Sequence, residues 1–251
     1  MAIRSLDAFE FRLLHSSTSA WRAIGVCIGA VLVLIACALR KWGAAEVSAN
    51  PNEIVFLTGI GLAWILITMQ LFSWLGVGAR DDAIERRNPA ALVAICGAII
   101  SVALVFTGGQ LGEGPTYWGN IFSTGLGTAG LFCLWLFLEL GTRISNSITE
   151  ERDFGSGVRL AAFLMATGLV LARAVAGDWK SELATLQDFI HDGWWVVVIW
   201  LSAVMLEWVC KPSRRRPFPR WQVFGLFPSG LYLGLAAAWL YHVGPWEGML
   251  K

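Results

Sequence analysis

Charged residues are scarce in this sequence, and the signs of a soluble protein are missing. Only 15% of the 251 residues are charged and 56% are hydrophobic, whereas a soluble domain has nearer a quarter charged residues. The net charge of +1 provides no basic face for a nucleic acid. The mean hydropathy is +0.61. This composition predicts an integral membrane protein.

Motifs that hold metals, phosphates or nucleophiles are absent as well. The three histidines are scattered, and no HExxH pair or carboxylate cluster has metal-ligand spacing. No serine or cysteine stands in a nucleophile elbow, and no P-loop occurs in a suitable context. The five cysteines lack CxxC spacing, so we interpret them as buried, unpaired small side chains. We therefore expect no enzyme, cofactor or metal.

Seven apolar segments reach the roughly 20 residues that a membrane-spanning helix needs. They are predicted near 22–40, 54–77, 89–108, 117–140, 157–176, 193–210 and 224–243. None is clearly broken, and the first lacks a cleavage site, so we expect a retained helix. Residues 2–14 fit a short interfacial helix or a frayed terminus equally well. The predicted fold is an all-α polytopic membrane protein.

A charged turn followed by a long apolar segment occurs twice, at 82–109 and again at 147–179. An offset of about 65 residues aligns Asn88 with Asp153, each placed to cap the apolar helix that follows. It also aligns Asp82-x-x-Glu85 with Ser147-x-x-Glu150, two predicted capping boxes. Cation binding by the two glutamates is the less favoured alternative. Two predicted crossings separate the copies, which indicates a parallel internal repeat.

This repeat divides the chain into five predicted regions. They are an N-terminal amphipathic segment (1–21), a first membrane helix with its outer loop (22–53), repeat one (54–112), repeat two (113–179) and a two-helix extension (180–251).

Lysine and arginine predict the orientation of these regions in the membrane. Twelve such residues fall in loops on one side and four on the other, which places the N-terminus in the cytoplasm and the C-terminus outside. A basic inner loop contains Lys211, Arg214, Arg215, Arg216 and Arg220. These charges suit anionic lipid headgroups, and an acidic protein partner at the cytoplasmic face would fit them equally.

Ionisable residues inside the apolar segments are the main functional candidates. Glu139 and Glu207 lie near the predicted cytoplasmic ends of their helices, and Arg159 lies at a similar depth. Arg173 lies toward the outer side, with Asp178 and Glu113 as candidate partners. These residues form either a polar pathway or ordinary ion pairs. Ion pairs are favoured, because charges near helix ends cost less than central ones.

The repeat resembles the YjfL-like family of bacterial inner-membrane proteins, whose function is unassigned. The resemblance rests on ERRNPAA in 54–112 and on TEERDFGSG and LARAVAGDW in 117–179. It covers about half of the chain, and Asp153-Phe154 replaces the Asn88-Pro89 of the first copy. The resemblance implies a bacterial inner-membrane location and an association with envelope-stress systems.

Two functions follow from these observations. The first is a non-enzymatic inner-membrane scaffold or partner-binding subunit. The alternative is a small channel or an ion- or proton-coupled transporter that uses Glu139, Glu207, Arg159 and Arg173. A homo-oligomer with a pore between its subunits is a further alternative. Pairing of the glutamates with Arg159 and the absence of a cavity beside them would count against transport.

Overall fold

A computed structural model describes residues 17–114, 116–212 and 220–244. Within these ranges the chain is helical and contains no strand. In chain order the elements are α2 (Ser17–Trp42), α3 (Ala45–Ala49), α4 (Pro51–Phe72), η1 (Ser73–Leu75), η2 (Ala79–Glu85), α5 (Pro89–Gly109), α6 (Tyr117–Thr142), α7 (Ile144–Thr149), α8 (Phe154–Val175), α9 (Glu182–Gly193), α10 (Val196–Cys210), α11 (Trp221–Phe224) and α12 (Leu226–Val243). The predicted interfacial helix at 2–14 and the loop arginines 214–216 lie outside the described residues.

The all-α polytopic membrane fold is confirmed. Among the described residues, six helical segments are long and apolar enough to cross a membrane. A seventh crossing exists if α9 and α10, which meet at a 45° bend, form one span. α10 alone has 15 residues, about 22 Å of helix, which is shorter than the roughly 30 Å hydrocarbon core.

The bend between α9 and α10 corrects the expectation of unbroken spans. It follows Gly193, a residue that weakens a helix. The next residues, Trp194 and Trp195, both pack against Trp239 of α12, and the rings of Trp195 and Trp239 stack with centroids 5.1 Å apart. This aromatic packing is compatible with the break and holds its two sides against α12.

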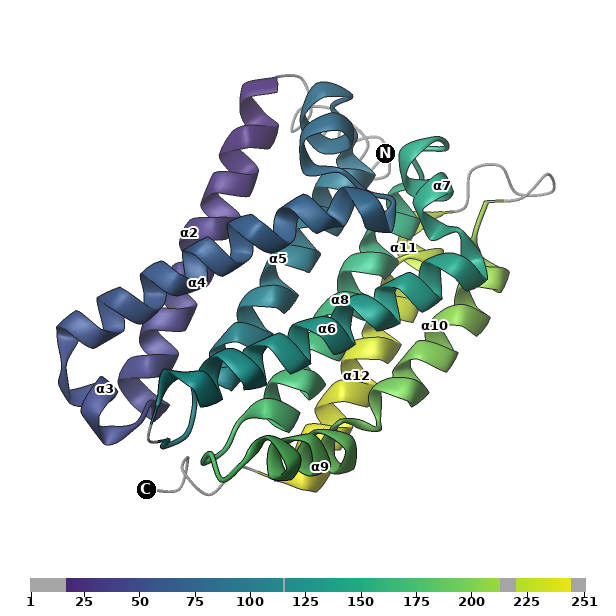
Figure 1. The fold of residues 1–251 in the computed structure, drawn as a ribbon. Coiled ribbons are helices and arrows are strands. Elements are labelled where there is room, and N and C mark those ends of the chain that lie inside the picture. The colour runs from purple at the N-terminus through teal and green to yellow at the C-terminus, as the bar shows by residue number, and fades with distance from the viewer. Residues whose placement is uncertain (1–16, 115, 213–219, 245–251) are drawn as a thin grey trace.

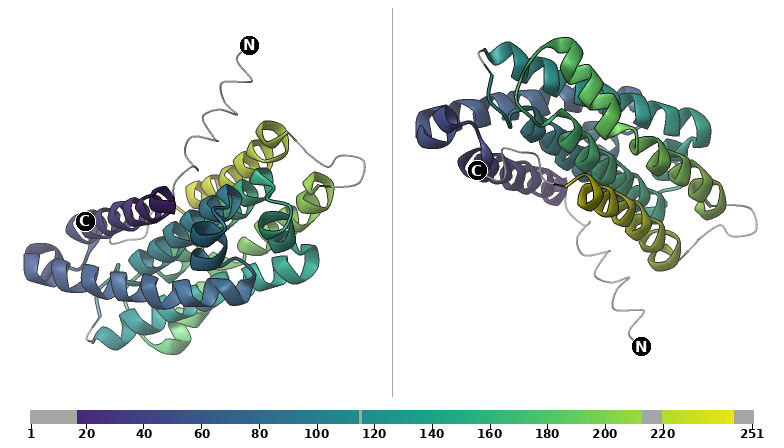
Figure 2. Two further views of the ribbon diagram at one scale, coloured as in Figure 1. Left: turned by 90° about the horizontal axis from the view of Figure 1, so that it is seen from above. Right: turned by 90° about the horizontal axis from the view of Figure 1, so that it is seen from below.

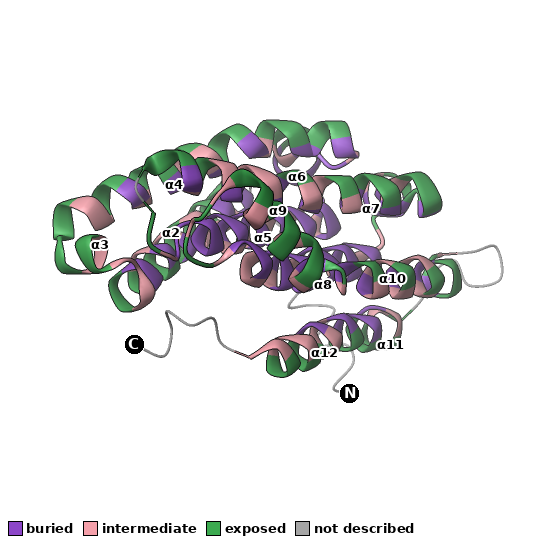
Figure 3. Ribbon diagram, turned by 60° about the horizontal axis from the view of Figure 1, so that its bottom comes forward, coloured by how far each residue is buried: buried purple, intermediate pink, exposed green. Residues whose placement is uncertain are grey.

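The membrane helices are arranged in three layers (Figures 1 and 2). α5 and α8 run side by side in the middle, with α2 and α12 on one face and α4 and α6 on the other. In the most apolar window of α5 and of α8, 72% of residues are buried, against 22–39% in α2, α4, α6 and α12. Figure 3 shows the same contrast. The outer helices expose large apolar side chains, as lipid-facing helices do, whereas α5 and α8 form the core.

Small residues form the seam between α5 and α8. A Cβ atom added to Gly108 would lie 2.2 Å from the carbonyl oxygen of Ala172, and one on Gly157 would lie 2.3 Å from that of Ala90. Gly97 and Gly168 approach the opposite helix in the same way. Such close approach replaces the hydrophobic drive that is missing between helices in lipid. It explains why this is the most extensive helix contact in the described chain.

Two units of the chain have the same order of elements: α4–η2–α5 and α6–α7–α8. In each, a short surface helix leads into a core helix, and both core helices begin at the same end of the bundle (Figure 1). Arg87 and Arg152 precede these helices and have φ angles of 49° and 53°. Left-handed backbone is uncommon for arginine, so its occurrence at both places indicates the same turn.

The chain alternates between the two ends of the bundle. The "α7 end" carries η2, α7, the end of α10 and the start of α11, and the "α9 end" carries α3, residues 110–114 and α9 (Figure 1). The α7 end exposes Arg80, Arg86, Arg87, Arg143, Arg152, Lys211 and Arg220. The predicted cytoplasmic side of the membrane corresponds to this end.

Candidate functional site: buried charges and an acidic cavity

Arg159 of α8 and Glu207 of α10 form a bidentate ion pair inside the bundle. Arg159 Nε donates to Glu207 Oε2 at 2.6 Å, and Nη2 donates to Oε1 at 2.8 Å. The side chains are only 1% and 2% exposed. The flat guanidinium and the carboxylate match in shape, which gives the pair its strength and its fixed geometry.

Arg159 makes two further hydrogen bonds. Nη1 donates to the carbonyl oxygen of Phe224 in α11 at 2.6 Å, and Nη2 donates to Ser156 Oγ at 2.8 Å. The carboxylate of Asp153 lies 3.8 Å from Nη2. One arginine therefore connects α8 with both α10 and α11, and the carboxylates of Glu207 and Asp153 compensate its charge.

Glu139 does not join this pair, although the sequence places it at a similar depth. Its carboxylate accepts hydrogen bonds from the backbone N–H and the hydroxyl of Ser145, at the start of α7. Arg143, between α6 and α7, has a φ of 53°. Glu139 thus stabilises the turn from α6 into α7, and these hydrogen bonds do not link it to Glu207 or Arg159.

The expected partners of Arg173 are wrong. Its Nη1 contacts Asp192 of α9 at 3.1 Å, and its Nε donates to the carbonyl oxygen of Gly244 at 3.2 Å. Asp178 instead accepts from the backbone N–H of Glu113 at 2.8 Å. The reason is that Asp178 and Glu113 belong to two loops that pair with each other, while α9 folds back toward Arg173.

Of the two caps predicted in each unit, only the one directly before the core helix forms. Asn88 accepts from the N–H groups of Ala90 and Ala91, and Asp153 accepts from that of Ser156. The predicted capping boxes do not form, because their first residues lie inside helices. Asp82 is inside the π-helical η2, where it accepts from Gly78 N–H and contacts Arg86, and Glu85 pairs with Arg80.

In the second predicted box, Ser147 lies inside α7 and Glu150 follows its end. Neither position can start a helix there. The prediction of a capping box at Asp82 and at Ser147 is therefore wrong, because each short helix begins three residues earlier.

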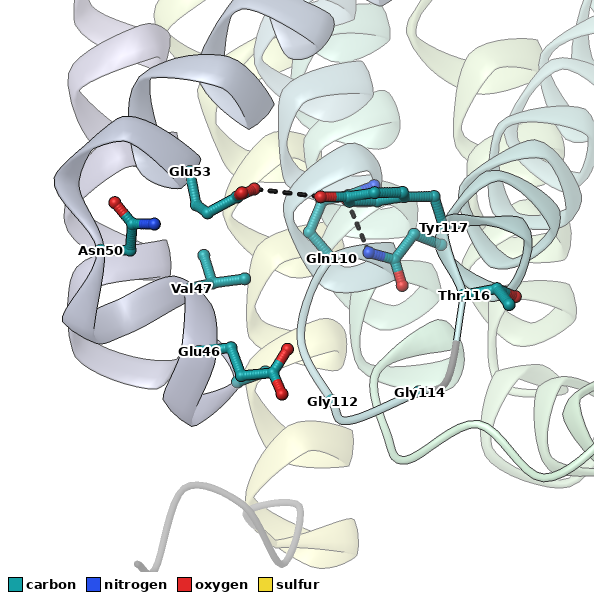
Figure 4. A pocket seen from close by; sticks show the side chains of 11 residues that line it. Glu46, Val47, Asn50, Glu53, Gln110, Gly112, Gly114, Thr116 and Tyr117 are labelled. Atoms are coloured by element: carbon teal, nitrogen blue, oxygen red, sulfur yellow. Dashed lines mark hydrogen bonds between the residues drawn. The ribbon is translucent and has the colours of Figure 1, made fainter.

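An acidic cavity opens at the α9 end, between α3, α4 and the start of α6 (Figure 4). Its volume is about 550 Å³, and its ionisable lining residues are Glu46, Glu53 and Tyr117. Tyr117 donates its hydroxyl to Glu53 at 3.1 Å. An adjoining cavity of about 480 Å³ shares Glu46 and adds Glu113. Carboxylates without a basic lining residue favour a cation or an amine.

Polar side chains continue from this cavity into the bundle. Asn120 donates to Gln110, and Gln110 donates to Thr124, each at 3.1 Å. A small cavity of about 80 Å³ adjoins these residues, and deeper still Trp64 of α4 donates to Thr128 of α6. The sequence does not predict this arrangement, because its members come from separate loops and helices. Within the described ranges, no three His, Cys, Asp or Glu residues form a metal site.

Comparison with known proteins gives one match. The model of a family described as a domain of unknown function (DUF350) matches residues 45–175, just over half of the chain. The match begins at the first residue of α3 and ends at the last residue of α8. No curated protein and no solved structure matches the chain.

Proposed function

This chain belongs to the DUF350 family of unknown function, and we propose that it is a non-enzymatic membrane scaffold that binds a protein partner. In this proposal α3–α8 is the family domain and α9–α12 is an extension fixed to it by Arg159 and Arg173 of α8. The molecule gives the partner a rigid platform in the membrane.

The Arg159–Glu207 pair is the observation that carries this proposal. Both side chains are buried and hydrogen-bonded to each other, so a change in the charge of either would break the ion pair between α8 and α10. The acidic cavity, its small continuation and the apolar groove between α2 and α12 are lined by residues other than Arg159, Glu207 and Glu139. The charges therefore act in packing.

A location in the bacterial inner membrane, with the α7 end in the cytoplasm, belongs to this proposal. The exposed bases of that end are its support, since lysine and arginine are retained on the cytoplasmic side. They also suit an acidic partner or anionic headgroups. The YjfL-like assignment and an envelope-stress role stay predictions that rest on resemblance.

A cross-linking experiment tests the partner. A photo-reactive residue is placed at Arg143, exposed at the α7 end, or at Leu140, an exposed apolar residue in the last turn of α6, in the native membrane. We expect discrete protein adducts at Arg143 and none at Leu140. Equal labelling at both positions, or none at Arg143 with the fold intact, would contradict a docking face there.

A channel or transporter is the second candidate, and the acidic cavity favours it. The cavity leads toward Gln110 and Thr124, which is how an outer vestibule for cations would begin. The test is proton and cation flux in proteoliposomes with wild type, Glu46→Gln/Glu53→Gln and Glu139→Gln/Glu207→Gln. The scaffold predicts no flux above empty liposomes. Flux that either double variant abolishes would establish transport.

A further inference from the structure

An apolar groove of about 630 Å³ lies at the α9 end, on the face opposite α4 and α6. Its walls are α2 and α12, and its floor is the end of the α5–α8 seam. Three parallel stretches each contribute four lining residues with one spacing: Leu34 to Lys41 in α2, Leu104 to Leu111 at the end of α5, and Leu169 to Ala176 at the end of α8. The sets from α5 and α8 are equivalent at the repeat offset.

The groove is polar only near its end. The hydroxyl of Thr107 donates to the carbonyl oxygen of Ala103 within its own helix. Apart from Cys37, the ionisable lining groups are Lys41 and Arg173. Arg173 is neutralised by Asp192. Lys41 is exposed, lies 4.7 Å from the centre of the Trp42 ring, and forms no salt bridge with any described residue. Its positive charge is available to a ligand.

We propose that this groove binds one anionic phospholipid, with the upper part of an acyl chain between α2 and α12 and the phosphate at Lys41. Its walls, α2 and α12, are long and apolar enough to cross a membrane, and acyl chains are the abundant apolar ligand there. The four lining positions of each long helix cover about 10 Å along the axis, from the apolar interior to the helix end. Trp42 and Lys41 stand where aromatic and basic residues meet headgroups.

A different role of Lys41 must be separated from this one. A cation in the last turn of α2 also interacts favourably with the C-terminal end of the helix dipole. That interaction does not depend on the lipid. Selectivity between anionic and neutral lipids therefore distinguishes the two roles.

The experiment is a lipid titration of the full, delipidated chain in detergent, followed by native mass spectrometry. Phosphatidylglycerol and phosphatidylcholine with identical acyl chains are compared for wild type, Lys41→Gln and Lys180→Gln. Lys180 is an exposed base at the same end that does not line the groove. We expect wild type and Lys180→Gln to prefer phosphatidylglycerol by about fivefold, and Lys41→Gln to lose this preference.

Three results would overturn the proposal. One is equal affinity of wild type for both lipids, or an equal preference in the two lysine variants. Another is equally tight binding of inorganic phosphate or of a six-carbon-chain phosphatidylglycerol, which would leave the groove without a role. The third is binding that occurs only after removal of residues 245–251, since the chain's own C-terminal residues would then be the occupant.

Discussion

The two copies of the helical unit differ in how their core helices meet the rest of the chain. At the positions of Arg159 and Arg173 in α8, the first copy has Ala94 and Gly108 in α5. Ala94 is buried among apolar residues, and Gly108 lets α5 approach Ala172 of α8. In the second copy, Arg159 contacts α10 and α11. Arg173 contacts α9 and Gly244, the residue after α12. The same helical unit thus provides close helix packing in the first copy and ion pairs with the extension in the second.

This difference coincides with the extent of the family domain. The family match ends at Val175, and every contact made by the two arginines with α9, α10, α11 or Gly244 crosses that limit. The two arginines in which α8 departs from α5 are therefore part of the joint between the family domain and the extension, beside the apolar packing of α12 on α8.

Breaking the buried pair of Arg159 and Glu207 should have the largest effect on the free energy of unfolding. Arg159→Met or Glu207→Leu leaves one charge unpaired in the interior, which should lower the free energy of unfolding by about 3–5 kcal/mol. Chemical or thermal unfolding in detergent measures the loss. Leu160→Met, a change between two apolar side chains of similar volume beside Arg159, is the control, and it should cost less. A loss below that of the control would contradict the attachment by charge.

Adding a methyl group in the seam between α5 and α8 should have the second largest effect on stability. Gly108→Ala places a methyl group against the backbone of α8, which should cost about 1–3 kcal/mol in unfolding free energy. Gly125→Ala in α6 is the matched control, because no atom lies within 4 Å of the added Cβ. The control should have unchanged or slightly higher stability. Equal stability of the two variants would show that α5 and α8 are not packed this closely.

Exchanging the caps between the copies should have an intermediate effect. Asn88 both caps α5 and donates its amide to the carbonyl oxygen of Ile148. Asn88→Asp removes that donor and buries a carboxylate, at a cost of about 1–3 kcal/mol. Asp153→Asn keeps the capping oxygen and should cost less than about 1 kcal/mol. Urea unfolding of both variants decides the order, and the reverse order would contradict the distinct roles of the turns.

Loosening the outer attachment should matter least. Arg173 and Asp192 are 18% and 20% exposed, against 1% and 2% for the buried pair, so Arg173→Gln should cost less, about 1–2 kcal/mol. Its effect should be local, seen as faster amide hydrogen exchange in α9 with unchanged exchange in α5. Global loss of protection would show that this attachment is as essential as the buried pair.

Sequence periodicity and composition could predict the membrane fold, because span length and apolar content decide it. The turn at Asn88 and Asp153 could be predicted too, since a cap before an apolar run is a local signal. The partner of Arg159 could not be chosen, because Glu139 and Glu207 have similar depth. That choice depends on α10 packing against α8 while Glu139 turns toward Ser145.

Other features had no local signal at all. Arg173 pairs with Asp192 because of the bend between α9 and α10, and Trp194, Trp195 and Trp239 meet there from distant parts of the chain. The acidic cavity brings together residues from α3, α4 and the start of α6. Pairings of this kind are set by tertiary packing, which one sequence does not reveal.

The stability of the double variant Arg159→Met/Glu207→Leu tests the central claim most directly. If the pair serves only to attach the extension, two apolar residues of similar size should restore most of the loss seen in each single variant. The unfolding free energies should then show a coupling of about 2 kcal/mol or more between the two positions. Additive losses, with no recovery in the double variant, would contradict the account.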